Sequence, residues 1–472
     1  MSVTVAAVDL GATSGRVLLG EVGADRLAVT TVARFPNTPV RIGDGLHWSI
    51  LELYRHVLDE LAAAHRTASG LTSIGIDSWG CDYALLRDGV MLSNPYSHRD
   101  ERTAAGVRAV HDRISPQDLF ARNGLQHLPF TTLYQLAVDR QRRLLRLADT
   151  MLLIPDLLTH WLTGTTVAER TNASTTGLLR ADTGEWDADL ARRLDVDPAL
   201  LPPLVDAGTD LGPIIGPARH ETGIDGVHVT AVGSHDTASA VVAVPATDPD
   251  IAYISCGTWS LVGVELERPV LTDAARRAGF TNERGVDGRI RYLHNVTGLW
   301  LLTETIRDWE RIGPPVDLSA LLAQAADITG ATPTFDADDP DFLGPGDMPA
   351  RIAAALLAAG QSAPTSRPAL VRTILASLAA AYARTIRAAA ETSGHTIRTV
   401  HLVGGGSQNT LLCQLTADAT GLPVLAGPAE ATAIGNILIQ ARTLGETGGS
   451  LESLRALVAR RCALRRYEPG RG

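Results

Sequence analysis

The chain has 472 residues, 45% of them hydrophobic and 20% charged, with a formal net charge of −10 at pH 7. This length suits two domains of ordinary size, and the composition is typical of a globular enzyme. An acidic surface is a poor match to the phosphate backbone of nucleic acids, so we expect no nucleic acid partner.

Membrane insertion and secretion are not expected either. No apolar run reaches the length of a membrane span, and Asp9 interrupts the first apolar stretch, which argues against a signal peptide. The four cysteines, at positions 81, 256, 413 and 462, lie far apart and form no CxxC pair, so neither a zinc site nor a disulfide framework is indicated. The sequence therefore predicts a cytoplasmic protein.

Lysine is absent from the sequence, and all 42 basic residues are arginine. This excludes Schiff-base chemistry, the P-loop, whose lysine reaches the β and γ phosphates, and the protein kinase mechanism. An ATP-binding enzyme of this composition must hold the phosphates with backbone amides, hydroxyls, a metal ion and arginine.

The first predicted elements form a β-hairpin. Residues 3–8 are a continuous β-branched and apolar run, typical of a buried strand, and residues 17–22 are a second apolar run. The turn between them is rich in small residues, and no helix follows the first strand. Residues 50–66 then have the apolar spacing of a helix, and residues 71–76 predict another strand, which ends at Asp77.

A similar hairpin is predicted at the start of the second half. Two prolines in a polar cluster at residues 243–250 mark a loop or a domain boundary. Residues 251–255 and 261–264 are apolar runs that flank a turn containing Gly257 and Thr258. The repeated pattern predicts two related domains, residues 1–242 and 243–472, although a repeat this short also arises by chance.

The remaining predicted elements alternate between helix and strand. Residues 313–364 accumulate proline, aspartate and glycine and predict a long surface excursion. Helices are predicted at residues 368–392 and 430–444, and strands at residues 399–403 and 423–426. The basic residues 460–471 predict a solvated tail.

The turn at residues 9–16 could bind an anion, because small residues let backbone N–H groups approach it closely and the hydroxyls of Thr13 and Ser14 can add hydrogen bonds. Asp9, at the end of a buried strand, could hold Mg²⁺ through water. A plain hairpin turn explains the glycines equally well. The motif does not match G-x-G-x-x-G, so a dinucleotide fingerprint is not supported.

Gly404, Gly405 and Gly406 stand between a predicted strand and a predicted helix. Their backbone can lie flat against a ligand, and the start of the following helix favours negative charge. The alternative is a flexible connection, and we favour ligand contact.

Asp236 follows a predicted strand at residues 227–232 and lies among small residues. A carboxylate there could accept a proton from a substrate hydroxyl. It could also cap the helix predicted after it, and the two roles are compatible. Ser234, His235 and Asp236 do not form a nucleophilic triad, because adjacent residues cannot usually adopt that geometry and no G-x-S-x-G elbow is present.

Taken together, the motifs resemble those of the FGGY carbohydrate kinases, within the actin-like ATPase superfamily. The similarity extends over nearly the whole chain. The blocks, in the family's order, are VDLGATSGR at 8–16, GIDSWGCD at 75–82, LPFTTLYQ at 128–135, SHDTASA at 234–240, GTWSL at 257–261, Asn295 with GLWLL at 298–302, residues 403–412, and residues 427–432.

The resemblance implies an α/β fold of two actin-like, ribonuclease H-like domains flanking an interdomain cleft, the first mainly binding sugar and the second mainly binding ATP. It implies ATP contacts at Ala12, Thr13, Ser14, Gly15, Arg16, Thr258, Thr303, Gly404 and Gly405, a Mg²⁺ role for Asp9, and sugar contacts at Gly80, His235, Asp236, Thr237 and Asn295. Asp236 matches the family's proton acceptor. Thr303 departs from the family, which typically has glutamine there, so this shorter side chain would need a water to reach the nucleotide.

The implied reaction is direct in-line transfer of the γ-phosphate of ATP to the C1 hydroxyl of a ketose, L-rhamnulose, with Mg²⁺ bridging the phosphates. The nearest alternative is another ketose, such as L-fuculose or L-xylulose. An alternative from a different class is a nucleotide-regulated scaffold of the actin-like superfamily, which would not need the sugar-side residues Trp79, Gly80, His235 and Asp236.

Overall fold

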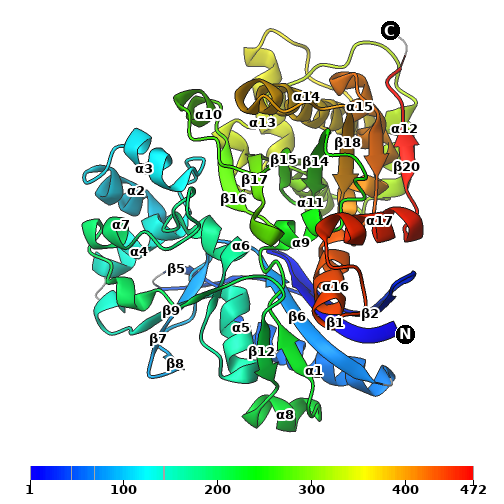
Figure 1. The fold of residues 1–472 in the computed structure, drawn as a ribbon. Helices are drawn as coiled ribbons and strands as arrows, with labels where there is room; N and C mark the ends of the chain where they lie inside the picture. Colours follow the sequence, from blue (N-terminus) through cyan, green and yellow to red (C-terminus); the bar gives the residue numbers. More distant parts are fainter. Residues whose placement is uncertain (1, 44, 69, 142–143, 471–472) are drawn as a thin grey trace. The chain divides into compact units, whose positions relative to one another are not determined.

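The computed structural model describes residues 2–43, 45–68, 70–141 and 144–470, and it forms two compact units (Figure 1). Unit 1 consists of Met1–Thr247, Glu265–Tyr292 and Ala431–Arg461, and unit 2 of Asp248–Val264, Leu293–Glu430 and Cys462–Gly472. The chain passes between the units five times, two of them within strands β15 (Ser260–Leu266) and β17 (Ile290–Val296). Each unit is therefore assembled from several separate segments of the chain. The two domains expected from the sequence, residues 1–242 and 243–472, stay a prediction.

Unit 1 is built on a six-stranded sheet with the order β12-β13-β6-β1-β2-β3. Strand β1 pairs antiparallel with β2, which confirms the predicted hairpin, and parallel with β6. The strands are β1 Ser2–Leu10, β2 Ser14–Gly23, β3 Arg26–Pro36, β6 Leu71–Ser78, β12 Asp210–Pro213 and β13 His228–Thr230.

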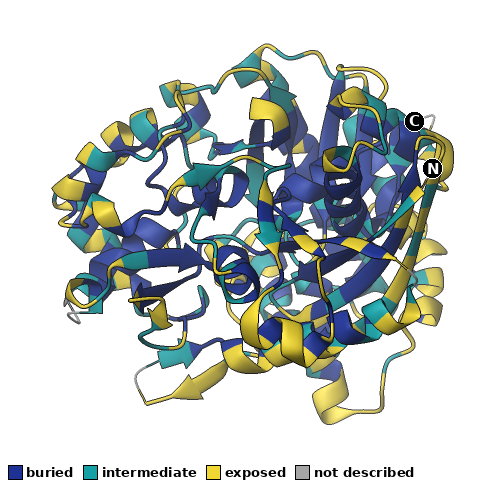
Figure 2. Ribbon diagram, turned by 60° about the horizontal axis from the view of Figure 1, so that its bottom comes forward, coloured by how far each residue is buried: buried dark blue, intermediate teal, exposed yellow. Residues whose placement is uncertain are grey.

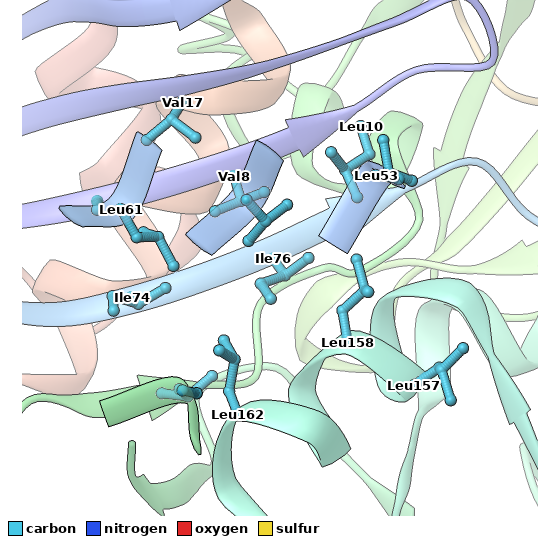
Figure 3. Close-up of a cluster of buried hydrophobic side chains, with 14 of the residues drawn as sticks. Val8, Leu10, Val17, Leu53, Leu61, Ile74, Ile76, Leu157, Leu158 and Leu162 are labelled. Carbon is cyan, nitrogen blue, oxygen red and sulfur yellow. The ribbon is translucent and has the colours of Figure 1, made fainter. Parts of the chain in front are cut away.

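Helices cover both faces of this sheet, and alternation along the strands decides which side chains each face receives. Val8, Leu10, Ile74 and Ile76 join side chains of α1 (Ile50–Thr67) and α5 (Ile154–Thr163) in one buried cluster (Figure 3). The opposite face packs against α16 (Ala431–Thr443). Asp9 and Asp77 alternate with the apolar residues and so belong to the α16 face.

A second buried cluster of unit 1 surrounds a three-stranded sheet with the order β8-β7-β9. Its elements are β7 Tyr83–Arg87, β8 Val90–Met91, β9 Thr150–Leu153, α2 Thr103–His111, α3 Pro116–Asn123, α4 Thr132–Gln141 and α7 Ala188–Arg193. Shorter elements of unit 1 that bear on the site are α6 Arg170–Ala173, α9 Asp236–Val242 and β16 Thr281–Arg284.

Unit 2 repeats the strand arrangement of unit 1. Its strands belong to a seven-stranded sheet with the order β16-β17-β15-β14-β18-β19-β20, in which the edge strand β16 falls within the residues of unit 1 and β14 is antiparallel to β15 and parallel to β18. The central strands of both sheets are buried over most of their length (Figure 2). The remaining elements are β14 Ile251–Cys256, β18 Thr399–Val403, β19 Val424–Ala426, β20 Arg465–Tyr467, α11 Trp300–Ile312, α12 Leu318–Ala326, α13 Met348–Ala358, α14 Arg367–Ser393 and α15 Thr410–Thr420.

Two expectations were wrong, and a third holds with added detail. The excursion at residues 313–364 lies mostly at the surface, as predicted, but it contains two helices, α12 and α13, which bury apolar residues such as Leu321 and Ile352. The basic tail is not simply solvated, because β20 pairs antiparallel with β19; Arg471 lies outside the described residues. One helix, α14, is long and apolar enough to cross a membrane, yet 72% of its apolar window is buried, as in the core helix of a globular unit.

Candidate functional site

The turn between β1 and β2 is held by hydrogen bonds that its sequence did not reveal. The side chain of Asn37 donates to the carbonyl of Gly11 at 2.8 Å, and its backbone N–H donates to the carbonyl of Thr13 at 3.0 Å. Ala12 is half-buried, whereas Thr13 and Ser14 are exposed. The turn therefore has a fixed backbone and two exposed hydroxyl-bearing residues, which is compatible with the predicted anion-binding role.

Gly15 and Arg16, from the same motif, have structural partners in unit 1. A Cβ on Gly15 would lie 2.2 Å from the ring of Phe35, so packing alone requires glycine there. Arg16 donates from Nε to Asp9 Oδ2 at 2.8 Å, and its Nη2 lies 2.6 Å from the same oxygen. Arg16 thus neutralises the buried Asp9 carboxylate.

Asp9 and Asp77 are directly paired at the ends of the adjacent parallel strands β1 and β6. Asp77 is fully buried and accepts a hydrogen bond from Asn436 Nδ2 on α16 at 2.6 Å, while its Oδ1 has no hydrogen-bond partner among the described residues. Burial raises the pKa of Asp77 well above its usual range, and the neighbouring Asp9 carboxylate raises it further. Two carboxylates held side by side in a buried sheet are unfavourable unless one of them is protonated or a cation lies nearby.

These carboxylates also bear on the metal predicted at Asp9. No group of three or more His, Cys, Asp or Glu side chains in the described ranges is arranged to hold a metal ion. Asp9 and Asp77 nevertheless supply carboxylate oxygens, the ligand type that Mg²⁺ prefers, and one of these oxygens lacks a hydrogen bond. The donor set fits a Mg²⁺ ion that keeps mostly water and phosphate ligands, and does not fit a complete protein cage.

Asp236 is the first residue of α9, directly after the N-cap residue His235. Its Oδ1 accepts hydrogen bonds from the backbone N–H of Thr237 at 2.5 Å and from the Thr237 hydroxyl at 3.1 Å. Negative charge at a helix N-terminus is favourable, and the side chain keeps 33% exposure. Asp236 is therefore both fixed at a helix start and accessible, but the predicted capping role falls to His235, because Asp236 is already inside the helix.

A buried carboxylate, Glu169, fixes the backbone just before Asp236, and the sequence did not point to it. Glu169 Oε2 accepts from the backbone N–H of Ser234 at 3.0 Å and from its hydroxyl at 2.9 Å, and it also caps α6. Thr171 Oγ1 accepts from the N–H of His235 at 3.3 Å, and Asn172 Nδ2 donates to the carbonyl of Ser234 at 3.3 Å. The start of α6 thus holds residues 234 and 235 in place.

Gly80 belongs to the same network. A Cβ on Gly80 would lie 2.8 Å from Thr175 Oγ1, and the following residue, Cys81, has a positive φ of 72°. Asn172, which bonds the Ser234 carbonyl, also donates to the carbonyl of Trp79 at 3.5 Å. Residues 79, 80, 234 and 235 are therefore linked within unit 1 through α6 and the 3-10 turn that follows it, and Asp236 and Thr237 come directly after them.

Asp82 anchors the aromatic residues beside Gly80. Its Oδ2 accepts from the indole N–H groups of Trp48 at 2.7 Å and Trp79 at 2.9 Å, and from the backbone N–H of His98 at 3.0 Å. Burial acts to raise the pKa of Asp82, but the His98 ring and the other donors outweigh it and hold the pKa below the usual range. Asp82 therefore stays ionised and orders this aromatic wall.

In unit 2, the hairpin turn and the glycine segment both lie at the end of β14. The carbonyls of Gly257 and Thr258 accept hydrogen bonds from Leu299 and Trp300 at the start of α11, each at 3.1 Å. A Cβ on Gly404, whose φ is 83°, would lie 2.9 Å from the carbonyl of Cys256, the last residue of β14. These contacts bring the predicted nucleotide residues Thr258 and Gly404 into one region.

The other predicted residues of unit 2 differ in accessibility. Gly405 is exposed, and a Cβ there would meet nothing within 4 Å, so no packing contact requires a glycine. The hydroxyl of Thr303 is exposed but donates to the carbonyl of Leu299 in its own helix, at 3.0 Å. Asn295 is half-buried on β17. Of these, Gly405 has the clearest surface for ligand contact.

Two α/β units with the same strand order, each with a tight turn after its first strand, define the two-domain actin-like ATPase class. The chain belongs to the FGGY family of carbohydrate kinases: residues 4–243 match the family's N-terminal domain and residues 252–444 its C-terminal domain. It is accordingly an ATP-dependent sugar kinase, and the family membership favours catalysis over the scaffold alternative.

Relatives with assigned names are similar over nearly their full length. The chain is 40% identical to a rhamnulokinase of Bacteroides thetaiotaomicron, covering 98% of this chain and 95% of the relative, and 40% identical to one of Klebsiella pneumoniae, covering 98% and 94%. Among solved structures, gluconate kinase from Lactobacillus acidophilus superposes with a TM-score of 0.80 at 15% identity, over 100% of this chain and 94% of that one. Plasmodium falciparum glycerol kinase with ADP superposes with a TM-score of 0.79 at 16% identity, over 99% and 94%. These structural similarities support the fold alone.

Proposed function

We propose that this kinase phosphorylates L-rhamnulose at its C1 hydroxyl and forms L-rhamnulose 1-phosphate, a step of L-rhamnose breakdown. The observation that carries the substrate assignment is the 38–40% identity to enzymes named rhamnulokinase over almost the whole chain. The observation that carries the chemistry is Asp236, a carboxylate that is fixed at a helix start and accessible.

In the proposed mechanism, Asp236 accepts the proton of the C1 hydroxyl, and the freed oxygen attacks the γ-phosphorus of ATP. A new bond forms between this oxygen and phosphorus as the bond from phosphorus to the ADP oxygen breaks, so ADP leaves in line with the attack. Gly80, His235 and Thr237 in unit 1, and Asn295 in unit 2, would bind and orient the sugar.

ATP would be held without lysine. We propose that Ala12, Thr13, Ser14, Gly15 and Arg16 contact its phosphates from unit 1, and that Thr258, Thr303, Gly404 and Gly405 contact the nucleotide from unit 2. Mg²⁺, carried by ATP and supported by Asp9 and Asp77, would neutralise phosphate charge. Backbone N–H groups in the turns would add the hydrogen bonds that a P-loop lysine supplies elsewhere.

The reaction takes place in the cytoplasm under this proposal. The four cysteines, Cys81, Cys256, Cys413 and Cys462, are all free thiols, as expected in a reducing compartment.

A substrate panel and one variant test the proposal. With ATP and Mg²⁺, L-rhamnulose should have the highest kcat/KM among ketoses that include L-fuculose and L-xylulose; a different best substrate would overturn the substrate assignment and leave the fold unaffected. Asp236→Asn should lower kcat by ~10²–10⁴, whereas Asp59→Asn, at an exposed position of α1, should not. Undiminished sugar-dependent ADP production by Asp236→Asn would exclude it as the base.

A further inference from the structure

His235 has a set of buried charged neighbours that the proposed reaction does not yet use. Arg291 on β17 is 0% exposed, and its Nη2 donates a hydrogen bond to His235 Nδ1 at 3.0 Å. The same Nη2 lies 2.8 Å from Oε2 of Glu283, a buried residue of β16. On the other side of the ring, His235 Nε2 lies 3.4 Å from Asp236 Oδ1. These four residues form a chain of contacts within unit 1.

The direction of the hydrogen bond from Arg291 determines where the ring proton lies. A guanidinium has only donors, so the His235 nitrogen that accepts from it must carry a lone pair. Nδ1 is therefore unprotonated, and in a neutral ring the proton belongs to Nε2. The Nε2–H group is the one that lies beside Asp236.

Glu283 does not compete for this proton in the observed geometry. Its Oε2 lies 3.1 Å from His235 Nδ1, but that contact lacks the direction of a hydrogen bond, and Oε2 accepts none from the residues that the structure describes. Burial acts to raise the pKa of Glu283, but the adjacent Arg291 guanidinium outweighs it and holds the pKa below its usual range. Glu283 therefore neutralises the buried guanidinium, and the pair adds no net charge beside Asp236.

We propose that Arg291, neutralised by Glu283, is a positioning residue that fixes His235 as the Nε2–H tautomer. His235 then offers a hydrogen-bond donor, and no positive charge, beside the carboxylate of Asp236 and the sugar hydroxyl. A cationic imidazolium at this distance would stabilise the carboxylate and make it a weaker base. This inference rests on the proposed role of Asp236 as the base, but the tautomer itself does not depend on the substrate.

The first test measures the tautomer directly. Nitrogen chemical shifts of [¹⁵N]histidine-labelled protein distinguish an N–H nitrogen from an unprotonated one, and comparison with His235→Gln assigns the His235 signals. We expect Nε2 protonated and Nδ1 unprotonated in the wild-type protein at neutral pH. A ring with its proton on Nδ1, or on both nitrogens, would overturn the proposal even if L-rhamnulose phosphorylation is confirmed.

A second test uses kinetics. Glutamine at position 235 keeps an amide N–H near the place of Nε2–H and has no tautomers. In the His235→Gln variant, Arg291 is therefore not needed to fix a tautomer. Arg291→Met should lower kcat/KM roughly tenfold or more in the wild-type background and less than about threefold in the His235→Gln background. Arg289→Met, two residues earlier in the chain with a partly exposed guanidinium, should change neither. Equal losses in both backgrounds would mean that Arg291 acts only on the fold, and would refute the proposal.

Discussion

Replacing Glu169 by alanine should weaken both the fold of unit 1 and its catalytic activity, because this carboxylate accepts hydrogen bonds that no other described residue is placed to accept. It takes the backbone N–H groups of Thr171 at 3.0 Å, Asn172 at 3.3 Å and Ser234 at 3.0 Å, and the Ser234 hydroxyl at 2.9 Å. Glu169 is 2% exposed, so water does not reach these donors in the wild-type protein.

The expected loss follows from these donors. Each buried N–H left without an acceptor costs about 1–3 kcal/mol, so three of them predict a loss of at least ~3 kcal/mol, with the upper limit lowered by water that enters the vacated space. For a unit of about 300 residues, a loss of ~3 kcal/mol lowers the Tm by about 5 °C. Because Asp236 follows Ser234 by two residues, a shift of ~1 Å should also lower kcat/KM by about 10²-fold.

Glu169→Gln is the matched comparison. It keeps one acceptor oxygen and removes a charge whose burial raises the pKa of Glu169 above its usual range, so its stability loss should be much smaller. Both variants are measured by thermal unfolding and steady-state kinetics. The control is Glu221→Ala, at an exposed position of α8 (Gly216–Thr222). If Glu169→Ala unfolds within 2 °C of the wild type and keeps its kcat/KM, the positioning argument is wrong.

Three further predictions concern glycines and a buried acid. In Gly435→Ala, the new Cβ would lie 1.8 Å from a carbonyl of α9, so we expect a loss of ~1–3 kcal/mol in thermal unfolding, against less than ~0.5 kcal/mol for Gly449→Ala, whose Cβ would meet nothing. Gly405→Ala should raise the KM for ATP at unchanged Tm, whereas Gly404→Ala should lower the Tm because of its positive φ and close carbonyl contact; equal Tm values would contradict this. The pKa of Asp77 is raised in the folded protein, so the free energy of unfolding should fall as pH rises from the ordinary aspartate pKa to the raised one, and should then level off. Urea titrations at several pH values measure this slope, and Asp77→Asn should remove it. An unchanged slope would mean that Asp77 is not the group responsible.

Both hairpins could be predicted from the sequence because their signal is local. Alternating or continuous apolar runs on either side of a turn of small residues specify strand, turn and strand without reference to the rest of the chain. The pairing of β1 with β2 and of β14 with β15 confirms this. Asp236 was also found locally, since a carboxylate among small residues after a strand predicts an accessible position.

The residues that hold Asp236 in place could not be found in this way. Glu169 bonds Ser234 across 65 residues, and Arg291 bonds His235 across 56. No periodicity links positions so far apart, and an isolated charged residue is more often at the surface than buried. A glycine in a motif can suggest a ligand contact where packing alone requires it. Gly15 is such a case, because its contact with Phe35 requires glycine whether or not a ligand binds.

Burial and hydrogen bonding distinguish the carboxylates of unit 1 that stabilise the fold from the one proposed as the catalytic base. Glu169 is buried and surrounded by donors, and Asp77 is buried with an oxygen left unbonded, so neither is accessible to a substrate hydroxyl. Asp236 alone combines a fixed helix-start position with 33% exposure. Asp236→Asn should therefore lose at most the ~0.3–1 kcal/mol of a charge at a helix N-terminus, while its kcat falls by ~10²–10⁴. A drop in Tm as large as that of Glu169→Ala would mean that the activity loss comes from the fold, and that Asp236 is not shown to be the base.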